Sequence, residues 1–182
     1  MSMRNVYLDV CLGAVALALA SASASTVAFA DGPNLGKPIT AQELAPWDIH
    51  IMPDGTGLPA GSGTSAQGAP IFAQKCAACH GEGAKGGQSA ALVGGPPRAS
   101  LDGGKTIPNY WPHATTLFDF IRRAMPYQAP KSLTDNEVYA VTAYILALNK
   151  LIGEADVVDA QSLPKVKMPN RENFIIRFPD RI

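Results

Sequence analysis

The sequence feature that most constrains this chain is the pentapeptide CAACH at residues 76–80. It has the C-x-x-C-H pattern at which haem is attached covalently to protein. Two thiols three positions apart at the end of a helix can each bond one vinyl group of the same porphyrin. The histidine that follows can bind the iron. The motif therefore predicts one covalent haem c, with Cys76 and Cys79 as attachment points and His80 as an axial ligand.

Two other chemistries use similar cysteine spacings. A redox-active dithiol needs no adjacent histidine and prefers a βαβ context. A zinc site needs a second pair of ligands, and neither His50 nor His113 has a spacing that would supply it. The remaining cysteine, Cys11, lies in a segment that we expect to be removed. We therefore interpret the motif as a haem site.

Residues 1–30 have the composition of a secretory signal peptide. Arg4 gives a positive start, residues 10–20 are apolar, and Ala-Phe-Ala at residues 28–30 forms a small-x-small cleavage site. The apolar run is too short to cross a bilayer comfortably, so we favour cleavage near Ala30 over a membrane anchor. Export to the periplasm agrees with the haem motif, because this kind of haem attachment takes place outside the bacterial inner membrane.

The balance of charges gives no support for two classes of partner. The chain of 182 residues has 15 basic and 15 acidic side chains. This balance gives no electrostatic reason to expect nucleic acid or an anionic membrane as a partner. The 17 glycines and 15 prolines predict long loops and few long helices or strands.

The distribution of proline and glycine divides the rest of the chain into three parts. Residues 31–64 are interpreted as an irregular arm packed on the domain, because breakers recur throughout them. Residues 65–150 form the expected haem domain. Residues 151–182 form an irregular tail, whose apolar end at residues 174–178 is expected to pack on the domain or on a partner.

Three stretches of the haem domain carry helix signals. Residues 65–80 are expected to form a helix that ends in the haem motif. Residues 115–124 have an apolar face, and either of the two opening threonines can cap them. Residues 134–149 begin with a capping box at Thr134. We expect the first and last of these helices to cross.

The crossing point is predicted by three residues. Gly68 and Phe72 stand eight and four positions before the haem motif, on one face of the first helix. A glycine there permits another helix to approach closely. Tyr144 of the last helix could then meet Phe72 over Gly68.

Met125 is the candidate for the second axial ligand. Pro126 follows it and favours extended backbone at Met125, which can aim the thioether at the iron. A thioether opposite an imidazole raises the haem potential and suits electron transfer. The rival ligands are Met168, Met52 and His113. An iron without a sixth protein ligand is the remaining alternative.

Residues 81–114 are rich in glycine and are interpreted as a loop around a flat cofactor. A phosphate site is disfavoured because no strand precedes them and no G-K-[ST] follows. Near the end of the loop, Tyr110 and Trp111 are candidate donors to the haem propionates, with ordinary aromatic packing as the alternative. The second ring nitrogen of the axial histidine needs an acceptor, for which the carbonyl of Pro96 or Pro97 is the candidate.

The order of these features resembles class I cytochrome c. The pattern G-x3-F-x3-C-x2-C-H over residues 68–80 is followed by a Met-Pro pair and then by a capped helix carrying Tyr144. The resemblance covers roughly residues 65–150. It implies an all-α fold of three to four helices around one haem, with His80 and Met125 as the axial ligands.

A narrower resemblance, to SoxD-type cytochromes, covers most of the chain after the signal segment. It rests on four segments: WDIHIMPDGTGLPAGSG at 47–63, YWPHATTLFDFIRRAMP at 110–126, residues 132–149, and LPKVKMPN at 163–170. The resemblance implies the cytochrome subunit of a periplasmic sulfane or sulfite dehydrogenase, paired with a molybdenum subunit. Some members carry two haems, whereas this chain has one C-x-x-C-H motif.

We therefore expect an electron-transfer subunit rather than a catalyst by itself. A molybdenum partner would oxidise the sulfur compound, and single electrons would leave through this haem to a downstream cytochrome or oxidase. The first alternative is a free soluble carrier to a terminal oxidase, which would have less need of the apolar arm and tail. The second is a haem enzyme or gas sensor with an open sixth site, and Met125 argues against it.

Overall fold

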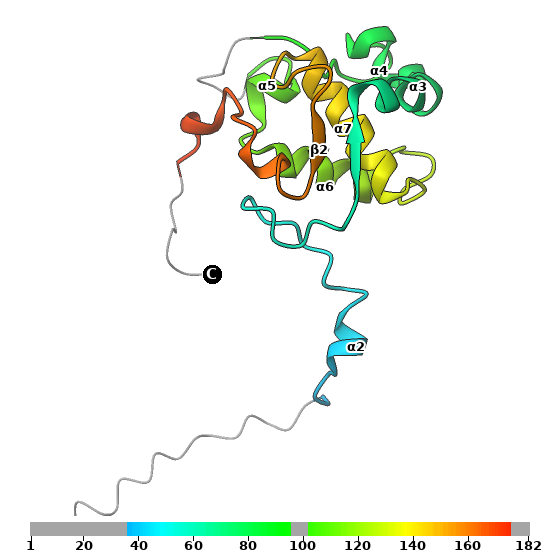
Figure 1. Ribbon diagram of the computed structural model, residues 1–182, viewed down its shortest axis with the longest axis vertical. Coiled ribbons are helices and arrows are strands. Elements are labelled where there is room, and N and C mark those ends of the chain that lie inside the picture. The colour runs from blue at the N-terminus through cyan, green and yellow to red at the C-terminus, as the bar shows by residue number, and fades with distance from the viewer. Residues whose placement is uncertain (1–35, 96–101, 176–182) are drawn as a thin grey trace, which may run out of the picture. The chain divides into compact units, whose positions relative to one another are not determined.

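The computed structural model describes residues 36–95 and 102–175, which form two units divided between Leu44 and Ala45. The first unit contains the short helix α2 (Ala41–Leu44). The second unit contains the other described helices and strands (Figure 1). The expected signal segment and its cleavage site near Ala30 lie outside the described residues. In the described part, no helix is long and apolar enough to cross a bilayer.

The helix expected over residues 65–80 is present as two pieces, α3 (Ser65–Lys75) and α4 (Ala77–His80). Thr64 starts α3 with a capping box, in which its hydroxyl accepts from the Gln67 N–H and the Gln67 side chain accepts from the Thr64 N–H. The backbone at Cys76 leaves the helical region, with φ of −126°. The CAACH motif therefore forms its own turn at the end of α3.

The other two expected helices are confirmed as α6 (Ala114–Ala124) and α7 (Asp135–Leu148). Thr134 caps α7 through the predicted capping box. The predicted threonine cap of α6 is wrong. The N-cap residue is His113, whose side chain makes no capping hydrogen bond, and Thr115 is buried within the helix.

The predicted crossing of α3 and α7 is confirmed (Figure 1). A Cβ atom on Gly68 would lie 1.9 Å from the carbonyl oxygen of Ala140, so only glycine fits there. The rings of Phe72 and Tyr144 lie 5.3 Å apart between the two helices. A partly exposed ion pair joins the same helices, with Lys75 Nζ 2.9 Å from Glu137 Oε1.

The core of the larger unit lies between α3, α6 and α7. Phe72, Phe118 and Tyr139 are fully buried there. The rings of Phe118 and Tyr139 lie 4.4 Å apart and join α6 to α7. Burial of such side chains stabilises a helical domain by about 1.5–3 kcal/mol each. This packing holds the three helices that surround the site described below.

Part of the expected arm lies on this core. Leu58 packs against the buried cluster. The hydroxyl of Tyr139 donates to the carbonyl of Pro59 at 2.8 Å, and Arg123 Nη2 donates to the carbonyl of Ile49 at 3.1 Å. These contacts fasten residues 49–59 to α6 and α7 without forming a helix.

The structure contains a two-stranded antiparallel sheet that the sequence did not predict. Strand β1 (Ser62–Thr64) pairs with β2 (Val157–Asp159), and Gly63 lies opposite Val158. The tail continues inward after β2, because Leu163 and Met168 are buried in the core. The remaining short helices are α5 (Ile107–Tyr110), η1 (Glu82–Ala84), η2 (Leu163–Lys165) and η3 (Arg171–Asn173).

The described end of the tail is more exposed. Phe174 is 42% exposed and its ring meets Tyr110 edge-on at 6.0 Å. Ile175 is 84% exposed. The last apolar residues of the predicted tail, from residue 176 on, lie outside the described part of the chain.

Candidate haem site

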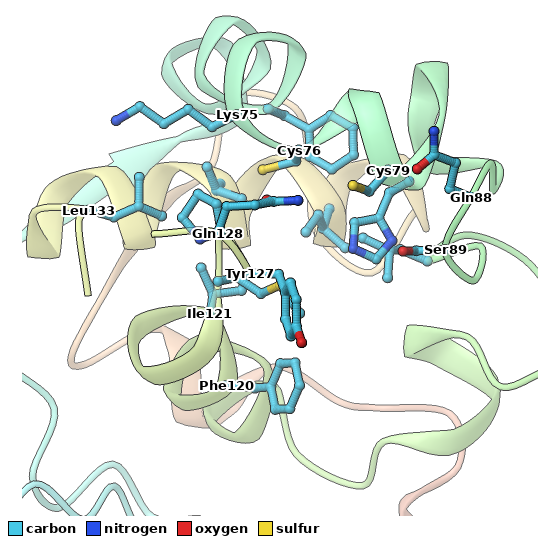
Figure 2. A pocket seen from close by; sticks show the side chains of 17 residues that line it. Lys75, Cys76, Cys79, Gln88, Ser89, Phe120, Ile121, Tyr127, Gln128 and Leu133 are labelled. Atoms are coloured by element: carbon cyan, nitrogen blue, oxygen red, sulfur yellow. The ribbon is translucent and has the colours of Figure 1, made fainter. Parts of the chain in front are cut away.

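A partly open cavity of about 520 Å³ is lined by residues of α3, α4, α6 and α7 and of the loops after α4 and α6. Cys76 and Cys79 lie on one wall with their thiols directed into the space, while Ile121 and Phe120 lie across from them (Figure 2). Val141 of α7 contributes to the apolar lining. Cofactor sites usually have volumes of about 300–1,000 Å³ and mainly apolar walls.

The two cysteines line this cavity and are not joined in a disulfide. Burial raises the pKa of Cys76 to about 11; the charge of Lys75 lowers it and Cys79 raises it, both by smaller amounts. Burial therefore favours the neutral thiol of Cys76 over its thiolate. Residues 36–95 and 102–175 also contain no cluster of three or more His, Cys, Asp or Glu side chains that could hold a metal ion.

The imidazole of His80 is held by one hydrogen bond. Its Nδ1 atom lies 2.9 Å from the carbonyl oxygen of Ala90. A carbonyl can only accept, so Nδ1 carries the proton and Nε2 keeps its lone pair for a metal. Pro96 and Pro97, the predicted acceptors, lie outside the described residues. Sequence reasoning missed Ala90, because every residue has a carbonyl and no residue type marks the one that is used.

Met125 follows the last turn of α6. Its N–H donates to the carbonyl of Ile121 at 3.1 Å, and its backbone is extended, with φ of −119° and ψ of 147°. This is the conformation that a following proline favours. Met125 lines the cavity, whereas Met52, Met168 and His113 do not. Met52 is 50% exposed, and Met168 is buried elsewhere in the core.

The two predicted propionate donors do not line this cavity. The ring of Tyr110 packs against Phe174, and the ammonium of Lys105 lies 4.8 Å from the centre of the same ring. Trp111 meets Phe120 edge-on at 5.5 Å, one layer behind the wall. Both rings therefore make aromatic contacts, Tyr110 makes a cation–π contact as well, and their role as propionate donors stays a prediction.

Besides Lys75 of α3 and the His80 imidazole, the polar side chains that line the cavity come from two loops. Gln88 and Ser89 lie beside Cys79, and Tyr127 and Gln128 follow Met125 and Pro126 (Figure 2). Amide and hydroxyl donors at these places can satisfy the carboxylates of a bound cofactor. The sequence contained no signal for them, because single polar residues in glycine-rich or turn segments have no spacing pattern.

The cavity fits a covalently bound haem. Two thiols lie on one wall, and one imidazole nitrogen keeps a free lone pair. A thioether and a mainly apolar lining complete the site. A haem needs these groups for attachment, axial ligation and exclusion of water.

Comparisons with known proteins agree with this fit. The family model described as cytochrome c oxidase, cbb3-type, subunit III, matches residues 63–145. The structure is similar to a chain of the crystal structure of the sulfane dehydrogenase SoxCD from Paracoccus pantotrophus. The two chains are 36% identical with a TM-score of 0.71, and the match covers 81% of this chain and 72% of that chain. The chain belongs to the SoxD-type c-type cytochromes. No curated protein matches it.

Membership of this family defines the chemistry in broad terms. A SoxD-type cytochrome is an electron carrier with covalently bound haem c. Its fold is the all-α class I cytochrome c fold that the sequence predicted, extended by the small sheet of β1 and β2. The matched family segment begins in β1 and ends within α7, so it contains both the CAACH motif and Met125.

Proposed function

We propose that this chain is a periplasmic cytochrome with one haem that transfers single electrons as the cytochrome subunit of a molybdenum-dependent sulfur-compound dehydrogenase. The observation that carries the proposal is a mainly apolar cavity lined by Cys76, Cys79, His80 and Met125. When bound, haem c supplies a one-electron change at its iron. In this role the chain is a redox subunit and not a catalyst by itself.

Each residue of the cavity has a separate part in the proposal. Cys76 and Cys79 would form the two covalent bonds to the haem, and His80 Nε2 and the Met125 thioether would bind its iron. With both axial positions filled, no substrate would bind at iron. Apolar side chains such as Ile121 exclude water, which disfavours the more highly charged oxidised state and so raises the potential.

The partner assignment is supported by the similarity to SoxCD, whose printed description is a sulfane dehydrogenase. The SoxD-type resemblance adds the molybdenum subunit and leaves sulfane sulfur or sulfite as the substrate class. A downstream cytochrome or oxidase would accept the electrons. The match extends over 81% of this chain and therefore beyond the family segment at 63–145, as expected for a chain that shares its assembly as well as its haem domain.

The proposed division of the chain follows from the same argument. Residues 1–30 direct export and are removed near Ala30, residues 31–64 form the arm, and residues 65–150 form the haem domain. Residues 151–182 form the tail, with its end available to a partner. The exposed Ile175 beyond the last described helix is in keeping with that use.

The test is affinity isolation of the tagged protein from the periplasm of its native host, with haem, molybdenum and protein quantified in the eluate. We expect one haem per chain, molybdenum in fixed ratio to haem, and haem reduction on addition of thiosulfate or sulfite. Haem without molybdenum in a fraction of monomer size would refute the dehydrogenase assignment and favour the free carrier. Binding of carbon monoxide to the ferrous protein at neutral pH would refute filled axial sites and favour a gas sensor or haem enzyme.

A further inference from the structure

We propose that Asn149 is a positioning residue for the axial histidine. It stands at the C-terminal cap of α7 and binds the loop that carries the carbonyl of Ala90. That carbonyl accepts the hydrogen bond from His80 Nδ1. The inference rests on the proposed role of His80 as an iron ligand and extends it to a residue 69 positions further along the chain.

The described hydrogen bonds of the Asn149 side chain are all made to backbone groups. Its Nδ2 donates to the carbonyl of Leu92 at 3.2 Å and to the carbonyl of Ile145 at 2.9 Å. Its Oδ1 accepts from the N–H of Gly94 at 3.0 Å. The side-chain amide of Asn149 therefore caps the C-terminus of α7 and also binds Leu92 and Gly94 of the loop.

The loop residues that Asn149 binds lie close in sequence to Ala90, whose carbonyl accepts from His80. Leu92 and Gly94 lie two and four residues after Ala90. Leu92 also donates its N–H to the carbonyl of Ala84 at 2.8 Å and accepts from the N–H of Ile107 at 3.2 Å. Backbone hydrogen bonds thus tie the loop to the end of η1 and the start of α5, and Asn149 ties it to α7, whose Val141 and Ile145 line the cavity.

Weakening the hydrogen bond of His80 should raise the reduction potential of the haem. A histidine that donates from Nδ1 to a carbonyl becomes a stronger electron donor through Nε2, and the same bond fixes the ring orientation. Displacing residues 90–94 would lengthen the bond between His80 and Ala90. The imidazole would donate less to the iron, the oxidised state would lose stabilisation, and the reduction potential would rise.

The experiment compares Asn149→Ala with Asn136→Ala in the haem-loaded protein. Asn136 is a matched control because it lies in the first turn of the same helix, where its Oδ1 accepts from the N–H of Ser62 at 3.0 Å, in contact with β1 and not with the loop of Ala90. Asn149→Gln is the conservative variant, since it keeps an uncharged amide with both the donor and the acceptor.

Three readouts separate positioning from general destabilisation. In Asn149→Ala, amide hydrogen exchange at Gly94 should be about tenfold faster, as expected for loss of its hydrogen bond to the Asn149 side chain. The nuclear magnetic resonance signal of the His80 Nδ1 proton should shift, and the reduction potential should rise. Asn149→Gln should give smaller changes, and it keeps the comparison possible if the alanine variant folds poorly. Asn136→Ala should leave all three readouts as in the unsubstituted protein.

Two results would overturn the inference in distinguishable ways. If the unsubstituted protein shows an iron-bound His80 signature but Asn149→Ala changes neither that signature nor the potential, Asn149 is a helix cap only. If the unsubstituted protein lacks the iron-bound signature altogether, the proposed ligation fails and the inference fails with it.

Discussion

The crossing of α3 (Ser65–Lys75) and α7 (Asp135–Leu148) makes Gly68→Ala the most informative single change to stability. The added Cβ would stand 1.9 Å from the Ala140 carbonyl oxygen, 2.5 Å from its carbon and 2.8 Å from the Tyr144 Cβ. Two of these three atoms are backbone, so no rotamer change relieves the contact. The helices must separate at the point where Phe72 and Tyr144 pack.

Two opposing contributions set the size of the effect. Alanine favours the helix over glycine by about 1 kcal/mol. Overpacking in a well-packed core costs about 1–3 kcal/mol, and more where backbone must move. Because backbone must move here, we take the cost at or above the upper end and expect a net loss of about 2 kcal/mol. For a chain of this size that corresponds to a fall in Tm of about 4–8 °C.

The assay is thermal and denaturant unfolding of the haem-loaded protein beside a control variant, Gly104→Ala. Gly104 has no atom within 4 Å of its would-be Cβ and its φ is not in the left-handed region, so the control should change stability by less than about 0.5 kcal/mol. A Gly68→Ala protein as stable as the unsubstituted one, or more stable, would refute the close approach as the reason for this glycine.

Two further predictions concern the axial ligand and acid stability. Met125→Ala should let carbon monoxide bind the ferrous protein and should lower the reduction potential. Met168 is a buried methionine outside the cavity, so Met168→Ala should lower the free energy of unfolding by about 2–5 kcal/mol and leave the haem spectrum unchanged. The opposite pattern of spectra would exchange the two roles. The pKa of Glu137 is lowered below its ordinary value by the backbone N–H of Thr134 and by Lys75. Its contribution to stability is therefore present above the pKa of the unfolded state, about 4.3, and is lost as pH falls through the pKa of the folded state. The loss of unfolding free energy in Glu137→Gln, measured by denaturant unfolding, should therefore shrink below about pH 4. A deficit that is the same at pH 7 and pH 3 would contradict this.

The parts of the fold that could be predicted are those with a local chemical signature. The capping box at Thr134 fixed the start of α7, and the spacing of Gly68, Phe72 and Tyr144 fixed its crossing with α3. Each signature follows from side chains that lie one helical turn or one contact apart. The haem motif is of the same kind, because its chemistry is contained in five consecutive residues.

The parts that escaped prediction depend on backbone groups or on long-range pairing. The strands β1 (Ser62–Thr64) and β2 (Val157–Asp159) have three residues each, too few for an alternating pattern to be recognised. The helix α5 (Ile107–Tyr110) is a single turn within a glycine-rich stretch. The acceptor for His80 is a backbone carbonyl, at Ala90, and such a group carries no residue identity. Tyr110 and Trp111 were predicted as donors to the haem propionates, and this stays a prediction; neither residue lines the cavity, and their rings pack against Phe174 and Phe120.

The short pairing of β1 with β2 joins the entry of the haem domain to its exit. Gly63, one residue before the cap of α3, lies opposite Val158, ten residues beyond the end of α7. Main-chain hydrogen bonds between β1 and β2 thereby close the chain between these strands into a ring. All the residues that line the cavity belong to this closed part of the chain. A fragment cut at the borders of the matched family segment, 63–145, would open this ring and remove Leu163 and Met168 from the core. Relocating the chain ends to a loop inside the ring, by circular permutation, would leave the closure intact and is the less disruptive way to re-engineer this cytochrome.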